Sequence, residues 1–446
     1  CYQCVKCTSG CPLNEYFDWQ PNQIMRALQL GQEQIALQSQ TPWLCASCQT
    51  CTTRCPQDLD IAGIMEYLTR LSVERGFEPQ VPPVDDFNQA FLREVHLWGR
   101  SYEPGVMAEF KLRNLQTLFD DLDMYLEFLK KGKVGFLPKA ARLPSKHKVE
   151  RIPGAAEAVA YYPGCSLEST AKEFDHSSRA VCQALDLPLI EPRGWVCCGS
   201  SPAHKVDPAY ALRMPMENLA LIEQAGFTEV TMPCAACYNR HKAAQHEIRH
   251  DPAQRAAVED EMHYTYQDKV SVSTLIEAIY RHIGPERVRG RVTRPLDDLK
   301  VAAYYGCLLT RPPEVTGAEH PENPTDMDEL LAALGAEVRD WSYKTTCCGA
   351  SHSLSRPDIV IDLSRKLVVQ ARQAGAEAIA VACPLCHMNL DARQMHMGLD
   401  ERETLPILYF TQLMGLALGL PIKTLGLHKH LVDPRPLLRQ KGFLND

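Results

Sequence analysis

The sequence predicts an α+β/α/β protein in which a helical N-terminal region precedes a duplicated α/β unit. Two observations lead to this fold class. Helical periodicity with few β-branched runs extends to about residue 130. From about residue 155, three cysteine-containing patterns occur twice, in the same order. A chain of 446 residues is long enough for roughly three such domains.

The first domain is expected to cover residues 1–130. Pro21–Gln38 has the apolar spacing of an amphipathic helix, and Ile61–Arg75 has it again, with Gly76 as a stop signal. Residues 84–130 continue in helical character. A basic linker is expected at 131–157, because glycines and prolines interrupt a run of basic residues there. The basic residues begin just before the linker and are Lys130, Lys133, Lys139, Arg142, Lys146, Lys148 and Arg151. Such a stretch is either solvated or used to dock a partner.

Two copies of one α/β unit are expected at 158–295 and 296–446, and a pseudo-twofold is the simplest relation between them. The sequence YYPGC ending at Cys165 matches YYGC ending at Cys307, and each follows a short apolar strand. The carboxyl ends of strands are where open α/β sheets place their sites. Near the end of the second copy, Leu405–Pro421 has the pattern of an amphipathic helix.

Nineteen cysteines are the most informative feature of the composition. Their clustering in a long chain favours metal binding over disulfides, which belong mainly to small secreted domains. Cys182 stands apart from the clusters and is expected to be a buried apolar thiol.

Two quartets with the spacing C-x2-C-x2-C-x3-C-P occupy the N-terminal region. This is the run of bacterial two-cluster ferredoxins, in which the fourth cysteine of each set ligates the other cluster. Structural zinc usually takes two paired Cys-x-x-Cys elements and fits poorly. The quartets therefore predict two cubane [4Fe–4S] clusters, one on Cys1, Cys4, Cys7 and Cys55, the other on Cys45, Cys48, Cys51 and Cys11.

Each α/β copy supplies five further cysteines, one more than zinc or a cubane needs. Adjacent cysteines suit a larger metal–sulfide core in which one thiolate bridges two irons, and Gly199 and Gly349 would let the backbone approach it. The two sets are Cys165, Cys197, Cys198, Cys234 and Cys237, and Cys307, Cys347, Cys348, Cys383 and Cys386.

These motifs resemble a known family. The five-cysteine repeats are similar to the CCG domain in the B subunit of heterodisulfide reductase, and the N-terminal region is similar to the C subunit of the same enzyme. The segments PENPT (321–325) and LYFTQL (408–413) support the likeness, which covers nearly the whole chain, as in a C–B fusion. The resemblance implies that each CCG set holds a noncubane [4Fe–4S] cluster, that the two clusters flank a disulfide, and that FAD resides on a partner subunit.

The expected function is therefore reduction or formation of a small thiol disulfide, with the ten CCG cysteines as the catalytic set and the cubanes as an electron relay. Disulfide cleavage takes two electrons, so two facing clusters could each serve one sulfur. The alternative is an electron-transfer adaptor that links a flavoprotein to another reductase or to quinone. His204, His352 and His387 lie beside the motifs and stay outside the catalytic set.

Partners and location follow from the remaining features. A net charge of −8 argues against nucleic-acid binding. We expect no transmembrane segment, a cytoplasmic location, an iron–sulfur flavoprotein as electron donor, and association with a membrane complex as an open option. The sequence starts at Cys1 rather than Met, which leaves open what precedes it, and nothing at its start resembles a secretory signal.

Overall fold

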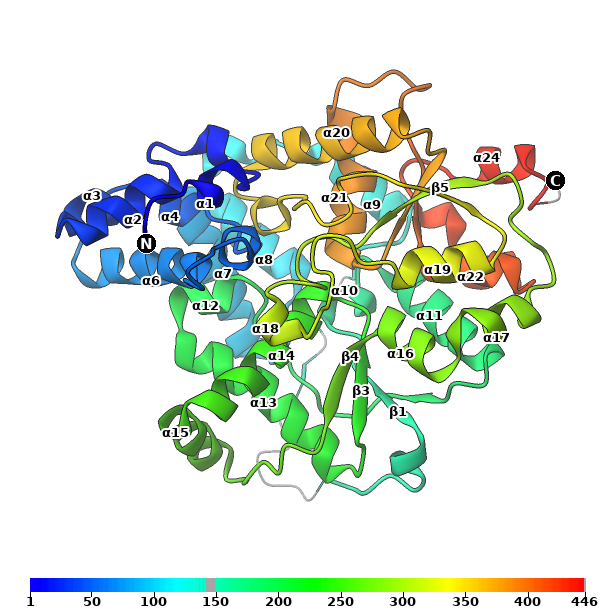
Figure 1. Ribbon diagram of the computed structural model, residues 1–446, viewed down its shortest axis with the longest axis horizontal. Coiled ribbons are helices and arrows are strands. Elements are labelled where there is room, and N and C mark those ends of the chain that lie inside the picture. The colour runs from blue at the N-terminus through cyan, green and yellow to red at the C-terminus, as the bar shows by residue number, and fades with distance from the viewer. Residues whose placement is uncertain (136, 139, 142–148, 445–446) are drawn as a thin grey trace.

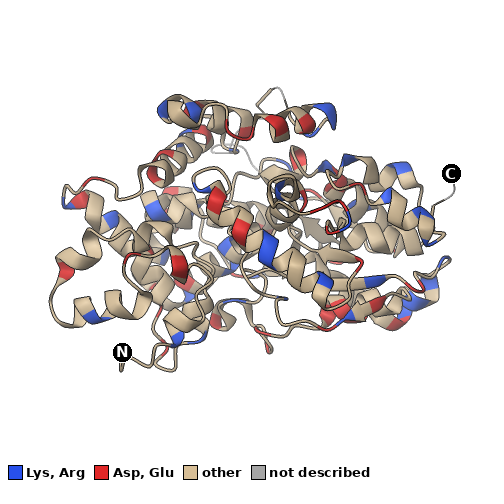
Figure 2. Ribbon diagram, turned by 90° about the horizontal axis from the view of Figure 1, so that it is seen from above, with Lys and Arg blue, Asp and Glu red and all other residues tan. Residues whose placement is uncertain are grey.

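The computed structural model describes residues 1–135, 137–138, 140–141 and 149–444. The helices of its first 75 residues lie at one end of the molecule, and the helices that follow, up to residue 130, extend towards the two α/β units (Figure 1). Lys139, Arg142, Lys146 and Lys148 of the expected linker lie outside the described residues. Acidic and basic residues are interspersed along the ribbon in Figure 2.

The N-terminal region is helical, as its periodicity predicts. Residues 21–38 form two helices rather than one, because Gly31 adopts a left-handed φ of +71° between them. The helix that ends before Gly76 begins after Asp60, whose carboxylate accepts the Gly63 N–H at 2.9 Å. The helices are α1 (Lys6–Ser9), α2 (Pro21–Gln29), α3 (Glu33–Leu37), α4 (Thr41–Leu44), α5 (Thr50–Thr53), α6 (Ile61–Glu74), α7 (Pro82–Trp98), α8 (Glu103–Arg113) and α9 (Leu122–Lys130).

The first α/β unit contains a parallel four-stranded sheet of order β2-β1-β3-β4. Its short central strands are almost wholly buried, as parallel sheets covered on both faces require. The strands are β1 (Val159–Tyr161), β2 (Leu189–Ile190), β3 (Glu229–Met232) and β4 (Ser271–Thr274). The helices are α10 (Cys165–Glu168), α11 (Lys172–Ala184), α12 (Pro202–Val206), α13 (Pro208–Gln224), α14 (Ala235–His250), α15 (Pro252–Met262), α16 (Leu275–His282) and α17 (Gly284–Arg291).

The second unit repeats this topology, with a parallel sheet of order β6-β5-β7-β8. The strands are β5 (Lys300–Tyr304), β6 (Glu337–Arg339), β7 (Ala378–Val381) and β8 (Ile407–Tyr409). The helices are α18 (Pro313–Thr316), α19 (Asp326–Ala333), α20 (Pro357–Gln373), α21 (Pro384–Ala392), α22 (Phe410–Ala417), α23 (Ile422–Leu425) and α24 (Arg435–Gln440).

The prediction of an amphipathic helix at Leu405–Pro421 is wrong in two respects. Residues 407–409 form the edge strand β8, and every residue of α22 is buried rather than one face alone. A helix that is apolar all round belongs in a core. The segment therefore completes the second sheet and then fills the space between the two units.

The two units pack reciprocally. Helix α11 of the first unit packs on α22 of the second, while α19 of the second packs on α16 and α17 of the first. Between the units the rings of Phe174 and Tyr409 stack at 4.1 Å, and the hydroxyls of Ser177 and Thr411 lie 2.7 Å apart. One continuous apolar core runs through both units.

Hydrogen bonds fix the loop of the second cysteine quartet to both units. Lys205 donates its ammonium to the Cys45 carbonyl at 2.8 Å, and Arg311 donates to Thr50 Oγ1 at 3.0 Å. His352 Nε2 lies 2.8 Å from the Leu44 carbonyl. All three side chains are buried. The helical region is thus held against the carboxyl ends of the strands.

Lys133, which belongs to the expected basic linker, is not exposed to solvent. Its ammonium is buried, pairs with the buried Glu173 carboxylate, and donates to the Thr170 carbonyl at 2.9 Å. Two opposite charges can be buried together when they also satisfy each other's hydrogen bonds. This part of the basic stretch is therefore anchored in the first unit.

Candidate redox site

The two N-terminal quartets have matching loop backbones. Gln3 and Val5 in the first loop adopt left-handed φ angles of 59° and 65°, and Ser47 and Gln49 in the second adopt 52° and 60°. Non-glycine residues are strained in this region and occupy it where the surroundings require it. Successive residues of this kind turn backbone N–H groups towards one centre, which suits an anionic group.

The fourth cysteine of the first quartet lies with the second. Burial raises the pKa of Cys11, and the next largest contribution comes from the charge of Cys48, with a smaller one from Cys45. This places Cys11 beside the second loop, as the exchange of fourth ligands in a two-cluster ferredoxin requires.

In the first α/β unit, five cysteines converge from three loops. The sulfurs of Cys198 and Cys237 lie 3.4 Å apart, and the Gly199 N–H donates to Cys197 Sγ at 3.4 Å. A hydrogen bond with Cys165 is the main cause of the raised pKa of Cys197. A side chain at Gly164 would meet Cys237 Sγ at 2.8 Å, so the backbone must be bare there.

The second unit has the corresponding contacts. The sulfurs of Cys348 and Cys386 lie 3.7 Å apart, and the Gly349 N–H donates to Cys347 Sγ at 3.3 Å. A hydrogen bond with Cys307 is the main cause of the raised pKa of Cys347. Gly306 takes the place of Gly164, since its Cβ would lie 3.0 Å from Cys386 Sγ.

The three groups of thiols touch one another in a defined order. A hydrogen bond with Cys347 is the main cause of the raised pKa of Cys48, which joins the second quartet to the second unit. A hydrogen bond with Cys234 is the main cause of the lowered pKa of Cys383, which joins the two units. The order is therefore second quartet, second unit, first unit.

A cavity of about 200 Å³ adjoins the first of these five-cysteine sites. All five cysteines of the first unit line it, whereas the second unit contributes other side chains to the described lining. The described lining is thus asymmetric between the two units, and Cys48 contacts Cys347 of the second unit. Helices α7, α8 and α9 supply an apolar wall that includes Phe87, Phe91, Val106, Met107, Met124 and Phe128.

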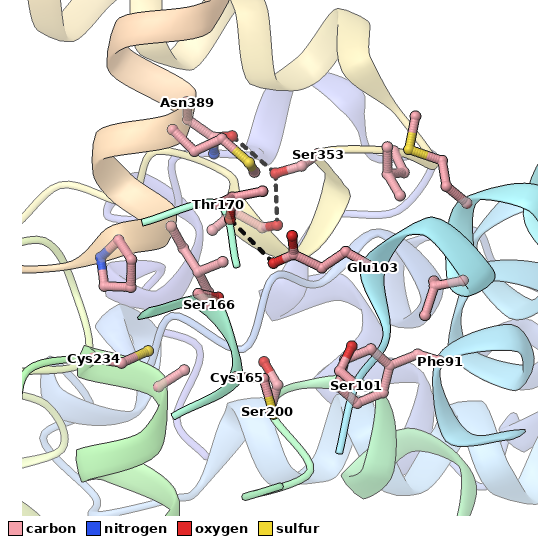
Figure 3. A pocket seen from close by; sticks show the side chains of 18 of the residues that line it. Phe91, Ser101, Glu103, Cys165, Ser166, Thr170, Ser200, Cys234, Ser353 and Asn389 are labelled. Carbon is pink, nitrogen blue, oxygen red and sulfur yellow. Dashed lines mark hydrogen bonds between the residues drawn. The ribbon is translucent and has the colours of Figure 1, made fainter. Parts of the chain in front are cut away.

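Glu103, the first residue of α8, is the acidic group of this cavity. Its carboxylate accepts a hydrogen bond from Thr170 Oγ1 at 3.1 Å, as Figure 3 shows. Burial raises the pKa of Glu103 to about 7, although hydrogen bonds with Ser169 and Thr170 and the charges of Lys133 and Lys172 act in the opposite direction. The carboxyl group is therefore able to carry a proton near neutral pH.

The other charged side chain of the cavity is already neutralised. Arg393 pairs with Asp121 and donates to the Ser353 carbonyl at 2.5 Å. Asn389 lies between Ser353, whose hydroxyl donates to it at 2.8 Å (Figure 3), and Cys348 Sγ at 3.5 Å. Among the described lining residues, no basic side chain is left free to bind an anionic ligand.

The three histidines beside the motifs make contacts within the fold. At His204 the backbone carbonyl accepts a hydrogen bond from Arg70, and the His352 side chain reaches Leu44 as described above. His387 stacks on Tyr409 with ring centres 4.2 Å apart and lies 3.0 Å from His430. Cys182 is fully buried in the core, as predicted.

The donor set fits iron–sulfur clusters. Grouped thiols are the soft ligands that such clusters take, and every described cysteine is free of disulfide bonds. Zinc would leave one thiol unused in each five-cysteine set. The sequence analysis did not identify Gly164, Gly306 and Glu103 as residues of the site. The matching glycines directly before Cys165 and Cys307 could have indicated a close backbone approach, whereas a single glutamate at the start of a helix gives no such indication.

This fold and donor set define an iron–sulfur oxidoreductase. Residues 159–240 and 301–391 match the family described as a cysteine-rich domain (CCG), and residues 1–60 match a 4Fe-4S dicluster domain. The chain belongs to the CCG-domain iron–sulfur protein family that includes the B subunits of heterodisulfide reductases.

Relatives agree with both parts of the chain. It is 33% identical over 283 residues to the 8-methylmenaquinol:fumarate reductase membrane anchor subunit of Wolinella succinogenes, covering 62% of this chain and 98% of that protein. It is 30% identical over 285 residues to the B subunit of a CoB-CoM heterodisulfide reductase of Methanosarcina acetivorans, covering 62% and 94%. It is 35% identical over 77 residues to the iron-sulfur C subunit of the CoB-CoM heterodisulfide reductase of Methanopyrus kandleri, covering 17% and 40%.

A crystal structure of a hypothetical protein from Helicobacter pylori shares the fold. The TM-score is 0.53 at 12% identity, covering 84% of this chain and 71% of the other. None of the helices in the described part of the chain has the length and apolarity needed to cross a bilayer.

Proposed function

We propose that this chain is the subunit of a heterodisulfide reductase-like complex that reduces, or forms, a thiol disulfide in the cavity beside the first CCG site. The carrying observation is that all five cysteines of the first unit line this cavity, and that one of them, Cys234, contacts Cys383 of the second unit. The repeated topology and reciprocal packing support a pseudo-twofold relation between the units.

The thiols fall into four proposed binding sets. Two hold cubane clusters, formed by Cys1, Cys4, Cys7 and Cys55 and by Cys45, Cys48, Cys51 and Cys11. Two hold noncubane clusters, formed by the five cysteines of each unit. When bound, the four clusters supply electrons singly from an FAD-containing partner subunit to the cavity.

The protein's own side chains provide the rest of the chemistry. Two electrons and one proton convert a disulfide to one thiol and one thiolate, and the neutral Glu103 carboxyl can donate that proton from its Oε atom to one of the two sulfurs. The apolar wall of α7, α8 and α9 limits water in the cavity. Burial raises the pKa of Glu103 to about 7, so about half of these carboxyl groups carry a proton at that pH.

A second candidate function is an adaptor that passes electrons to or from a quinone. The cavity favours it in one respect, since its wall is apolar and the described lining offers no free cation for an anionic coenzyme. The Wolinella relative is named as a subunit of a menaquinol:fumarate reductase.

Turnover by the cluster-loaded chain separates the two functions. Reduced viologen would serve as donor under anaerobic conditions, with a panel of thiol disulfides in one arm and a short-chain naphthoquinone in the other. Reduction of a disulfide supports the reductase. Reduction of the quinone alone supports the adaptor, and no turnover of either would contradict both.

A further inference from the structure

Among the described residues of the segment that follows Lys111, 112–135 and 137, an unusual number of large apolar side chains are exposed. Leu112 is 70% exposed, Leu115 65%, Phe119 77% and Leu137 82%. They lie on the end of α8, the short 3-10 helix Leu115–Thr117, and the residues that flank α9. We call residues 112–135 together with Leu137 the apolar surface. Single exposed leucines are ordinary, whereas a group of this kind marks an interaction site.

Helix α9 at its centre is apolar on two faces. Leu122, Leu126 and Leu129 repeat at helical spacing and are exposed, while Met124 and Phe128 are buried on the other side against the redox cavity. A helix on the surface of a protein in water normally places polar residues on its outer face. The outer face of α9 therefore suits an apolar environment.

The chemistry of these side chains fits lipid better than protein. Protein interfaces concentrate tyrosine, tryptophan and arginine at their centres and under-represent leucine. The exposed large apolar residues of this surface are leucines with one phenylalanine, the composition of helices that lie in a membrane interface. Basic residues lie at both ends of this segment, Lys111 and Arg113 at its start and Lys130 and Lys131 near its end. Arg113 pairs with Glu109 and Lys130 with Glu127, whereas Lys111 and Lys131 donate to backbone carbonyls and bring positive charge that anionic headgroups can meet.

We propose that the apolar surface, residues 112–135 and Leu137, binds the surface of a lipid bilayer containing anionic lipid, with α9 lying in the interface without spanning it. The inner face of the same helix lines the cavity with Met124, Tyr125 and Phe128. Where the proposed function holds, the redox cavity then lies on the membrane side of the molecule, which suits a lipid-soluble substrate.

Vesicle flotation tests the proposal without reference to turnover. The full cluster-loaded chain is mixed with vesicles of phosphatidylcholine and phosphatidylglycerol, at low and at high salt. The variant Leu115→Asp/Phe119→Asp removes two exposed apolar side chains. The matched control Leu30→Asp/Val73→Asp changes residues that are 56% and 50% exposed elsewhere. Iron content and circular dichroism verify that each variant is folded.

The parent and the control should float with the vesicles, and high salt should weaken this binding without abolishing it. The surface variant should bind at least about tenfold more weakly, because each buried apolar side chain contributes on that scale. Failure of the parent to float, or equal flotation of the surface variant, would overturn the proposal. So would a parent dimer that ignores vesicles and becomes monomeric in the surface variant, since the surface would then join two copies of the chain.

Discussion

Replacing Glu103 by glutamine keeps the size of the side chain and its ability to accept a hydrogen bond from Thr170, but removes its acidic proton. If Glu103 is the acid of the cavity, Glu103→Gln slows disulfide reduction by about 10²- to 10⁴-fold near pH 6, the usual range for loss of a general acid. Iron content and cluster absorbance should remain those of the parent.

The pH profile of the parent gives the sharper number. Burial raises the pKa of Glu103 to about 7, so the carboxyl is neutral below that pH and loses its proton as the pH rises through it. The neutral fraction is about nine-tenths at pH 6 and about one-hundredth at pH 9, so the rate should fall about 90-fold between them. The charges of Lys133 and Lys172 and the hydroxyl of Tyr125 act on this carboxyl, so the measured pH profile already contains their effect on its pKa.

The assay is anaerobic turnover with reduced viologen over this pH range, accompanied by infrared spectra of the carboxyl band. Glu103→Gln should flatten the profile and remove one titrating carboxyl band. Glu109→Gln, on the same helix but paired with Arg113 at 2.8 Å, is the control and should leave the profile unchanged. A parent profile that is flat across pH 7, or an unchanged profile in Glu103→Gln, would refute the assignment.

Two further predictions concern the frame around the site. Lys133→Met leaves the Glu173 carboxylate buried without its partner and should lower the free energy of unfolding by about 3–5 kcal/mol, measured by anaerobic denaturant titration; Lys133→Met/Glu173→Gln should recover much of the loss. Cys48→Ser should slow electron delivery from the flavoprotein partner far more than delivery from viologen, because Cys48 is the thiol that contacts Cys347. Cys4→Ser should show the same selectivity; equal losses with both donors would contradict the relay.

Much of the fold could be read from the sequence because it is carried by local signals. The matching loops before Cys165 and Cys307 are parts of one repeated sheet topology, and the stop signal at Gly76 ends α6. Leu405–Pro421 could not be assigned correctly, since a buried strand followed by a buried helix shows no one-sided periodicity. Its place depends on the other unit, which covers it.

The sequence predicts which thiols gather at the candidate site but not what surrounds them. Spacing singles out thiols such as Cys11 and Cys234, because a metal–sulfur centre requires several of them at short separations. The contacts Cys48–Cys347 and Cys234–Cys383 depend on how three domains dock, and the same is true of Glu103 in the cavity wall. The burial of Lys133 likewise follows from a partner 40 residues away in the chain.

The joint action of the two CCG sites is tested most directly by removing one thiol from each. Cys198→Ala and Cys348→Ala would be compared with Cys182→Ala, which changes a buried cysteine of the core that has no place in either set. Iron would be counted anaerobically, with about 16 atoms per chain expected for four clusters of four irons.

We predict that Cys198→Ala and Cys348→Ala each abolish viologen-driven disulfide reduction while the other CCG site and the quartets keep their iron, and that Cys182→Ala retains both iron and activity. Substantial disulfide reductase activity in a chain whose iron count shows one CCG site empty would contradict the account.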